Sequence, residues 1–483
     1  MVALDALDVR WLKRWAAEGR LPNLARFMER CDHVSVSSDG ATLHGSVWPT
    51  FALGAGPGEH GVYWWLQWLS EEARYVRNNH PAFAYEPFWD AVIGAGKRVV
   101  VVDVPYTPAV RGRGVWTANG WGLHDEMQPV SYPDPFLQAL RRRYGDHPLR
   151  ADTLQPTENP GRLKMAERLR RGVAMRARMV CDFAGRRDWD LFITTFAETH
   201  KAGHYLAEPA KLGPGKTNED ALVAMLEPLD TVWPEIVRRA GDDCEIILFA
   251  LHGMEPQVDY AQGVADQLLA VLNGRPPESG VRAPDLLRRL RDVLPAGLQD
   301  AIWLALPSGV RSRRFSTAHA REIESATWFA VAHDGSIALR AAVEGREGGG
   351  CIAAEEVPRL LDAVEARVAG AVADDGQEAF GTLLRLAERF AGPRAGRLPD
   401  GLLLLNPAVM RTSAVQGRDF VLRNVAQEAR NGVHTGTGFC YVHPGNGGVV
   451  RRDEVDSRDF APTVLSRLDV RPPRNLYGEV FVI

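Results

Sequence analysis

Short apolar runs rich in β-branched residues alternate with longer helical segments, and this alternation limits the folds open to the chain more than any other feature. Arg98–Val104 (RVVVVDV) has the continuous apolar character of a buried parallel strand, and Asp190–Phe196 and Glu245–Leu251 share it. Val2–Asp5 predicts a short strand ending on a carboxylate, and Trp11–Arg30 has helical spacing. Strands separated by helices imply βαβ units. The sequence therefore predicts an α/β fold with a mostly parallel sheet flanked by helices.

The character of the sequence changes in the middle of the chain. Between about Gly253 and Pro399, helical segments rich in Arg, Glu, Ala and Leu surround a strand-like stretch and a GREGGG loop. We interpret 254–399 as an inserted cap region and assign 1–253 and 400–483 to the core. The strand-like Gly401–Asn406 (GLLLLN) is expected to return the chain to that core. A chain of 483 residues has room for such an arrangement.

The composition excludes several classes of protein. Hydrophobic residues make up 45% and charged residues 24%, which is typical of a globular chain. The net charge of −4 argues against nucleic acid or an anionic membrane as the main partner. We find no apolar run near the roughly 20 residues that cross a bilayer and no basic signal peptide. Five scattered cysteines without a CxxC pair argue against a disulfide framework. We expect a cytoplasmic protein, and its oligomeric state stays open.

Residue types that bind metals recur at the predicted strand ends and in loops next to glycine. They are Asp5, His200, His204, His252 in LHGM, and His434 in GVHTG. His200 and His204 are four residues apart, so on a helix both imidazoles face the same side and can share one ion. Any one of these histidines, taken alone, is more simply a loop or core residue. Their combined order along the chain favours a metal site.

Several blocks of the sequence together resemble the alkaline phosphatase superfamily, specifically its type I phosphodiesterase/nucleotide pyrophosphatase branch. The blocks are VALDALD and GRLPNLARF near the start, WPTFALGAGPGEHG, WDLFITTFAETHKAGHYL, IILFALHGM, NGVHTGTG and DFAPTVLSRLDVRPPRNLYGEVF. They follow the family's order, and the middle insertion corresponds to its variable cap. The resemblance implies an alkaline-phosphatase-like core and a phosphoester hydrolase that holds two divalent ions.

The resemblance also implies an altered ligand set. The family binds one ion through an aspartate, a histidine four residues later and a late histidine. Carried over to this chain, these positions are His200, His204 and His434, so that a histidine replaces the aspartate. Three histidines with an open fourth position suit zinc, and iron or manganese would also be accepted.

The second ion site that the resemblance implies is weaker. It keeps Asp5 and His252, but Leu251 stands where another aspartate is expected. Only Asp5 remains of three aspartates, so two divalent ions would leave about three uncompensated charges in a low-dielectric cleft. We therefore expect one or two divalent ions, with one well occupied. A second ion becomes plausible if His44 replaces a missing ligand.

The attacking group is the most open assignment. His44 occupies the position spaced like the family's nucleophile, and Thr42, Ser46 and Thr50 are the nearby hydroxyls. Ser46 follows a glycine and is a candidate nucleophile, because covalent phosphoryl transfer needs an activated hydroxyl. His44 is a candidate phosphoryl acceptor or general base. Direct attack by water is a further alternative.

These observations predict a metal-dependent hydrolase of a phosphate monoester, phosphodiester or related small anionic ester. The altered ligands leave two alternatives open. In one, the same scaffold holds a histidine-rich mononuclear centre for non-phosphoryl, conceivably redox, biosynthetic chemistry. In the other, the chain is a degenerate, non-catalytic binding protein without a stoichiometric metal. Fold alone does not choose between them.

Overall fold

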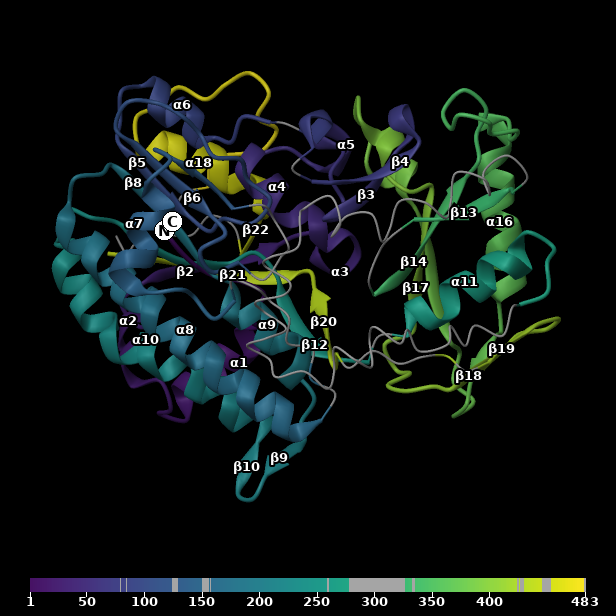
Figure 1. Ribbon diagram of the computed structural model, residues 1–483, viewed down its shortest axis with the longest axis horizontal. Helices are drawn as coiled ribbons and strands as arrows, with labels where there is room; N and C mark the ends of the chain where they lie inside the picture. The colour runs from purple at the N-terminus through teal and green to yellow at the C-terminus, as the bar shows by residue number, and fades with distance from the viewer. Residues whose placement is uncertain are drawn as a thin grey trace. The chain divides into compact units, whose positions relative to one another are not determined.

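The computed structural model describes two compact units of the chain (Figure 1). The described residues are 1–78, 80–83, 85–123, 129–149, 156, 158–258, 260–277, 326–331, 335–423, 425, 430–444 and 453–481. The first unit comprises Met1–Gly56, Pro81–Pro256 and Asn431–Ile483, and the second comprises Pro57–His80 and Gln257–Arg430.

The first unit is built on a nine-stranded sheet with the order β22-β2-β21-β11-β1-β8-β5-β6-β7. These strands are β1 (Val2–Leu4), β2 (Asp32–Ser37), β5 (Val99–Val102), β6 (Val115–Asn119), β7 (Val130–Tyr132), β8 (Leu191–Phe196), β11 (Ile246–Ala250), β21 (Thr437–His443) and β22 (Glu454–Asp456). From β11 through β1, β8 and β5 to β6 all pairings are parallel, whereas β21 runs antiparallel to both of its neighbours. This arrangement confirms the predicted α/β fold with a mostly parallel sheet.

Helices follow the strands of the first unit. They are α1 (Val9–Ala17), α2 (Pro22–Met28), α3 (Gly40–Leu43), α4 (Val47–Leu53), α6 (Trp89–Gly94), α7 (Phe136–Tyr144), α8 (Asn159–Arg186), α9 (Ala197–Leu206), α10 (Asn218–Ala240) and α18 (Phe460–Arg467). The long helices α8 and α10 pack along each other (Figure 1). The helical stretch expected over Trp11–Arg30 is two helices, because Gly19 has a φ of +71° and Pro22 begins α2.

The second unit contains a separate four-stranded antiparallel sheet with the order β13-β14-β17-β16. Its strands are β13 (Trp328–Ala330), β14 (Ser336–Ala341), β16 (Phe380–Arg385) and β17 (Gly401–Leu405), and its longer helices are α11 (Ala261–Leu272) and α16 (Val357–Val368). The hairpin of β3 (Leu66–Leu69) and β4 (Arg74–Arg77) also belongs to this unit. Smaller strands are β15 (Val372–Ala373), β18 (Ala414–Gln416) and β19 (Val421–Arg423).

The place of β17 corrects the expected domain boundaries. Gly401–Asn406 was expected to return the chain to the core, but β17 lies between β14 and β16 in the second unit. Leu403 and Leu405 are buried in that unit's own hydrophobic cluster. The chain re-enters the first unit at Asn431, and 57–80 joins the second unit before the expected insertion at 254. An apolar run identifies a buried strand, but it does not say which sheet buries it.

Candidate metal centre

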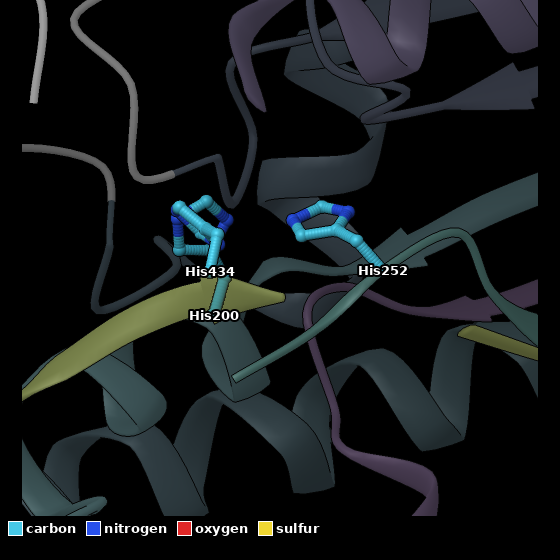
Figure 2. A group of neighbouring side chains, drawn as sticks. All are labelled: His200, His252 and His434. Atoms are coloured by element: carbon cyan, nitrogen blue, oxygen red, sulfur yellow. The ribbon is translucent and has the colours of Figure 1, made fainter. Parts of the chain in front are cut away.

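Five histidines of the first unit lie together, and we call this group, with Asp5, the histidine centre. His434 is in the middle: its ring centroid lies 4.7 Å from His200, 4.8 Å from His204, 4.9 Å from His252 and 4.6 Å from His44. Figure 2 shows the imidazole of His252 turned toward those of His200 and His434. The structure therefore brings together all the predicted metal-binding histidines.

The topology of the sheet explains this convergence. β1 lies between β8 and β11, and all three run parallel. The residues that follow them therefore emerge at one edge of the sheet, namely Asp5, helix α9 and His252. The short strand β20 (Gly432–Thr435) pairs with β12 (Gly253–Pro256), and this register sets His434 opposite Met254.

Helix α9 turns two imidazoles toward each other. The Nε2 atoms of His200 and His204 are 3.0 Å apart. The Nδ1 atom of His204 is 2.9 Å from the carbonyl oxygen of Gly432, and that of His200 is 2.9 Å from Oδ2 of Asp5. A side chain on Gly432 would collide with the backbone of Gly203, so only glycine lets β20 approach α9 this closely.

The hydrogen bonds of α9 fix which nitrogens can bind a cation. A carbonyl or carboxylate oxygen accepts hydrogen bonds, so the Nδ1 atoms of His200 and His204 carry the protons. In the neutral rings both Nε2 atoms then hold lone pairs that face each other across 3.0 Å. Two acceptors repel at this distance unless a cation, either a metal ion or a proton, lies between them. The geometry fits an ion bound through both Nε2 atoms.

His434 also fits the role of a neutral ligand. Burial, followed by the neighbouring His44, His200, His204 and His252, lowers the pKa of His434 well below its usual value. Within the described residues, its Nδ1 atom has no hydrogen-bond partner. His200, His252 and His434 each offer one ligand atom, and these atoms lie within 4.8 Å of one another. Imidazole donors suit zinc and other late first-row metals, so the chemistry of this donor set fits a divalent ion.

Asp5 and the candidate attacking groups occupy different surroundings. Asp5 is buried and contacts His200, as described. His44 stacks on His434 with an interplanar angle of 28°. Ser46 is fully buried, and its Oγ finds no hydrogen-bond partner among the residues that the structure describes. The structure thus stacks His44 on His434, whereas the Ser46 hydroxyl makes no hydrogen bond to any described residue.

Sequence reasoning missed a buried cluster on the other side of α9, which we call the arginine network. Arg176 lies 3.0 Å from Asp103 and 3.4 Å from Glu198, and Glu198 lies 2.7 Å from Nε2 of His147. Burial by itself would raise the pKa of Glu198. The neighbouring Arg176 and His147 lower it by more, so the pKa of Glu198 lies below its usual value. Arg176 lies within a helix rich in arginine, where the sequence pattern gives no sign that this one is buried. Asp103 directly follows the valines of β5. Its position at a strand end was the one sequence signal that could have identified it as part of a buried polar cluster.

The fold and the histidine centre together define an α/β protein with a candidate metal site at the carboxyl edge of a mostly parallel sheet. The model of the type I phosphodiesterase / nucleotide pyrophosphatase family matches residues 1–302, more than half of the chain. The chain therefore belongs to this family, which confirms the resemblance seen in the sequence.

Solved structures with the same fold have little sequence in common with the chain. Phosphonoacetate hydrolase from Sinorhizobium meliloti 1021, in complex with phosphonoformate, has a TM-score of 0.51 and 16% identity over 97% of this chain and 94% of its own. Human ectonucleotide pyrophosphatase / phosphodiesterase 5 has a TM-score of 0.50 and 11% identity, and the match covers 98% of this chain and 96% of the human protein's chain. At such identities the likeness shows the fold alone. No curated protein sequence matches the chain.

None of the helices in the described parts of the chain has both the length and the apolar composition needed to cross a membrane.

Proposed function

We propose that the protein is a metal-dependent hydrolase of a small phosphate ester or related anionic ester, with one divalent ion in the histidine centre. Membership of the phosphodiesterase family supports the reaction class. The observation that carries the metal is the facing pair of Nε2 atoms on His200 and His204, whose Nδ1 atoms are both engaged by oxygen. Zinc best matches a site of imidazoles with an open position.

Each member of the centre takes a defined part in this proposal. His200, His204 and His434 hold the ion, with the Nε2 atom of His204 facing that of His200 at 3.0 Å. His252 has a ligand atom within 4.8 Å of those of His200 and His434, so it lies close enough to join them. When bound, a divalent ion supplies Lewis acidity that polarises the phosphoryl oxygen and stabilises the charge of the transition state. The low pKa of His434 keeps its ring neutral near pH 7, as a ligand must be.

Water is the attacking group that the surroundings favour, with His44 as its base. Within the centre, His44 stacks on His434, whereas the Ser46 hydroxyl is buried and has no hydrogen-bond partner among the described residues that could take its proton. One water oxygen bonds to phosphorus, the ester bond from phosphorus to oxygen breaks, and the water proton passes by way of His44 to the leaving oxygen. The substrate would be a small anion, which needs no nucleic-acid or membrane partner.

The decisive experiment measures metal content and turnover in the same untagged preparation. We expect about one zinc, manganese or iron ion per chain by elemental mass spectrometry, and hydrolysis within a panel of phosphate monoesters, phosphodiesters, pyrophosphates and phosphonates. His204→Ala should lose the ion and at least about 100-fold of the turnover, since even outer partners of metal ligands contribute 10- to 100-fold. His33→Ala is the matched control, because His33 is an exposed residue of β2. Retention of both metal and turnover by His204→Ala would refute the assignment.

One observation favours a second candidate function. The donor set is made of imidazoles, and Leu251 precedes His252 where a carboxylate would strengthen a two-ion phosphoesterase site. A mononuclear histidine centre also suits iron in non-phosphoryl chemistry. Bound iron together with no turnover of any phosphoester in the panel would favour this second function over the first.

A further inference from the structure

Asp5 is held on both of its carboxylate oxygens. Trp48 of α4 donates from Nε1 to Oδ1 at 3.0 Å, and Nδ1 of His200 lies 2.9 Å from Oδ2. The backbone of Asp5 is fixed as well, because its N–H donates to Phe196 and its carbonyl accepts from the Thr199 hydroxyl. The carboxylate is 1% exposed, so it is oriented by protein groups rather than by water.

Trp48 is itself fixed by aromatic packing. Its indole lies edge-on to Phe51, with ring centroids 5.5 Å apart, and to Phe249 of β11, with centroids 6.3 Å apart. The indole N–H can only donate a hydrogen bond. Its direction therefore determines where Oδ1 of Asp5 lies, and the other oxygen is left to face His200.

The contact with Asp5 places the carboxylate on the far side of His200 from the candidate ion. The two nitrogens of an imidazole point away from each other across the ring. Asp5 lies at Nδ1, whereas His204 lies at Nε2. An ion bound at Nε2 is therefore separated from Asp5 by the width of the ring. In metal sites, a carboxylate in this position fixes the histidine's tautomer and raises its basicity.

We propose that Asp5 is a positioning residue for His200, held in place by Trp48, and that the ion of the histidine centre is bound by imidazoles without a carboxylate ligand. This inference rests on the proposed function for the presence of the ion. It departs from the sequence interpretation, in which Asp5 holds or orients a second ion or a water. The single carboxylate acts through the proton on Nδ1 of His200, and it leaves the ion's positive charge directed toward an anionic substrate.

The first test is made on the unaltered, metal-free protein. Nuclear magnetic resonance of the protein with ¹⁵N-labelled histidine reports which ring nitrogen of His200 carries the proton, with His200→Gln used to assign the signal. We expect the proton on Nδ1, whereas imidazole in water prefers it on the other nitrogen. A proton on Nε2 of His200 would overturn the proposal, and the signal itself is read on the unaltered protein.

The second test measures zinc affinity and zinc stoichiometry by competition with a coloured chelator. Asp5→Asn should bind the same number of zinc ions about 10- to 100-fold more weakly, because the uncharged amide is a poorer acceptor for His200. Trp48→Phe, which keeps the ring and removes the N–H, should weaken zinc binding in the same direction by a smaller factor. A loss of one zinc ion per chain in Asp5→Asn would make Asp5 a ligand and overturn the proposal, as would unchanged affinity.

Asp230→Asn is the matched control for these variants. Asp230 is a buried carboxylate of the same unit that accepts hydrogen bonds from the backbone of Asn23 and Leu24. Its replacement tests the general effect of removing a buried charge, and zinc affinity should stay at the unaltered value. Tautomer and affinity are read without substrate, so absent hydrolysis would refute the proposed function alone. A reversed tautomer would refute only the role of Asp5.

Discussion

Helix α9 contributes to two buried polar clusters, and these clusters are built in opposite ways. On one side, Glu198 enters the arginine network, where Arg176 has a carboxylate within 3.4 Å on each side. On the other side, His200 and His204 enter the histidine centre, where their imidazole rings lie close to that of His434. The arginine network has cations and anions in contact. The histidine centre instead gathers imidazole nitrogens that could hold a cation.

This difference separates a structural cluster from a candidate ligand site. Buried polar groups are normally satisfied by hydrogen bonds, and Asp103 of the arginine network follows that rule, since it also accepts from the backbone of Gly120, Trp121 and Gly122. Oε2 of Glu198 has no hydrogen bond within the described residues, but its charge is paired with Arg176 at 3.4 Å. In the described part of the chain, Nδ1 of His434 lacks such a partner. An unsatisfied buried nitrogen among other imidazoles costs stability unless a ligand engages it. The two clusters should therefore respond differently to mutation, metal and pH.

Breaking the arginine network should give the largest loss of stability. Arg176→Met leaves Asp103 and Glu198 buried without their cation, so we expect the free energy of unfolding to fall by about 3–5 kcal/mol. Chemical denaturation measures this loss. The folded fraction should still bind the same number of zinc ions, because no ligand is removed. A variant that folds normally but binds no zinc would contradict the separation of the two clusters.

Metal should stabilise the protein through the histidine centre alone. Zinc at about 100 times its dissociation constant should raise the free energy of unfolding by about 2.7 kcal/mol. The rise is measured by thermal or chemical unfolding with zinc and with chelator. His204→Ala should abolish it, and Arg176→Met should keep it. Equal stabilisation of the His204→Ala variant would place the ion elsewhere.

The smallest expected effect is on the pH dependence of stability, which should also differ between the two clusters. The folded-state pKa of His434 is lowered, so the unfolded chain takes up the proton first, at about pH 6.5. The metal-free protein should therefore lose stability as the pH falls below about 6.5, and His434→Gln should reduce this loss. The pKa of Glu198 is also lowered, but its contribution is present above about pH 4.3 and is lost only below it. Denaturation at pH 8, 6 and 5 measures the slope, and an unchanged slope in His434→Gln would contradict the prediction.

Much of the fold and of the histidine centre could be predicted from the sequence, from the apolar runs of the strands and from the residue types at their ends. The runs that became β5, β8 and β11 are short, apolar and separated by helices, so a parallel sheet followed from pattern alone. His200 and His204 could be predicted to lie on one face of a helix, because they are four residues apart and a helix repeats every 3.6 residues. The apolar run of β17 carried no such information about its partner strands, and the chain was assigned to the wrong sheet there.

The sequence by itself determined that this chain forms a mostly parallel α/β unit and that histidines follow its strands. Those properties depend on local periodicity and on residue type. Only the tertiary structure decided that Asp5 faces Nδ1 of His200, that Trp48 fixes its other oxygen, and that Arg176 is buried against Glu198. Each of these contacts joins residues that are at least 22 positions apart in the chain. Their geometry is set by how strands and helices pack, and no local pattern in the sequence encodes it.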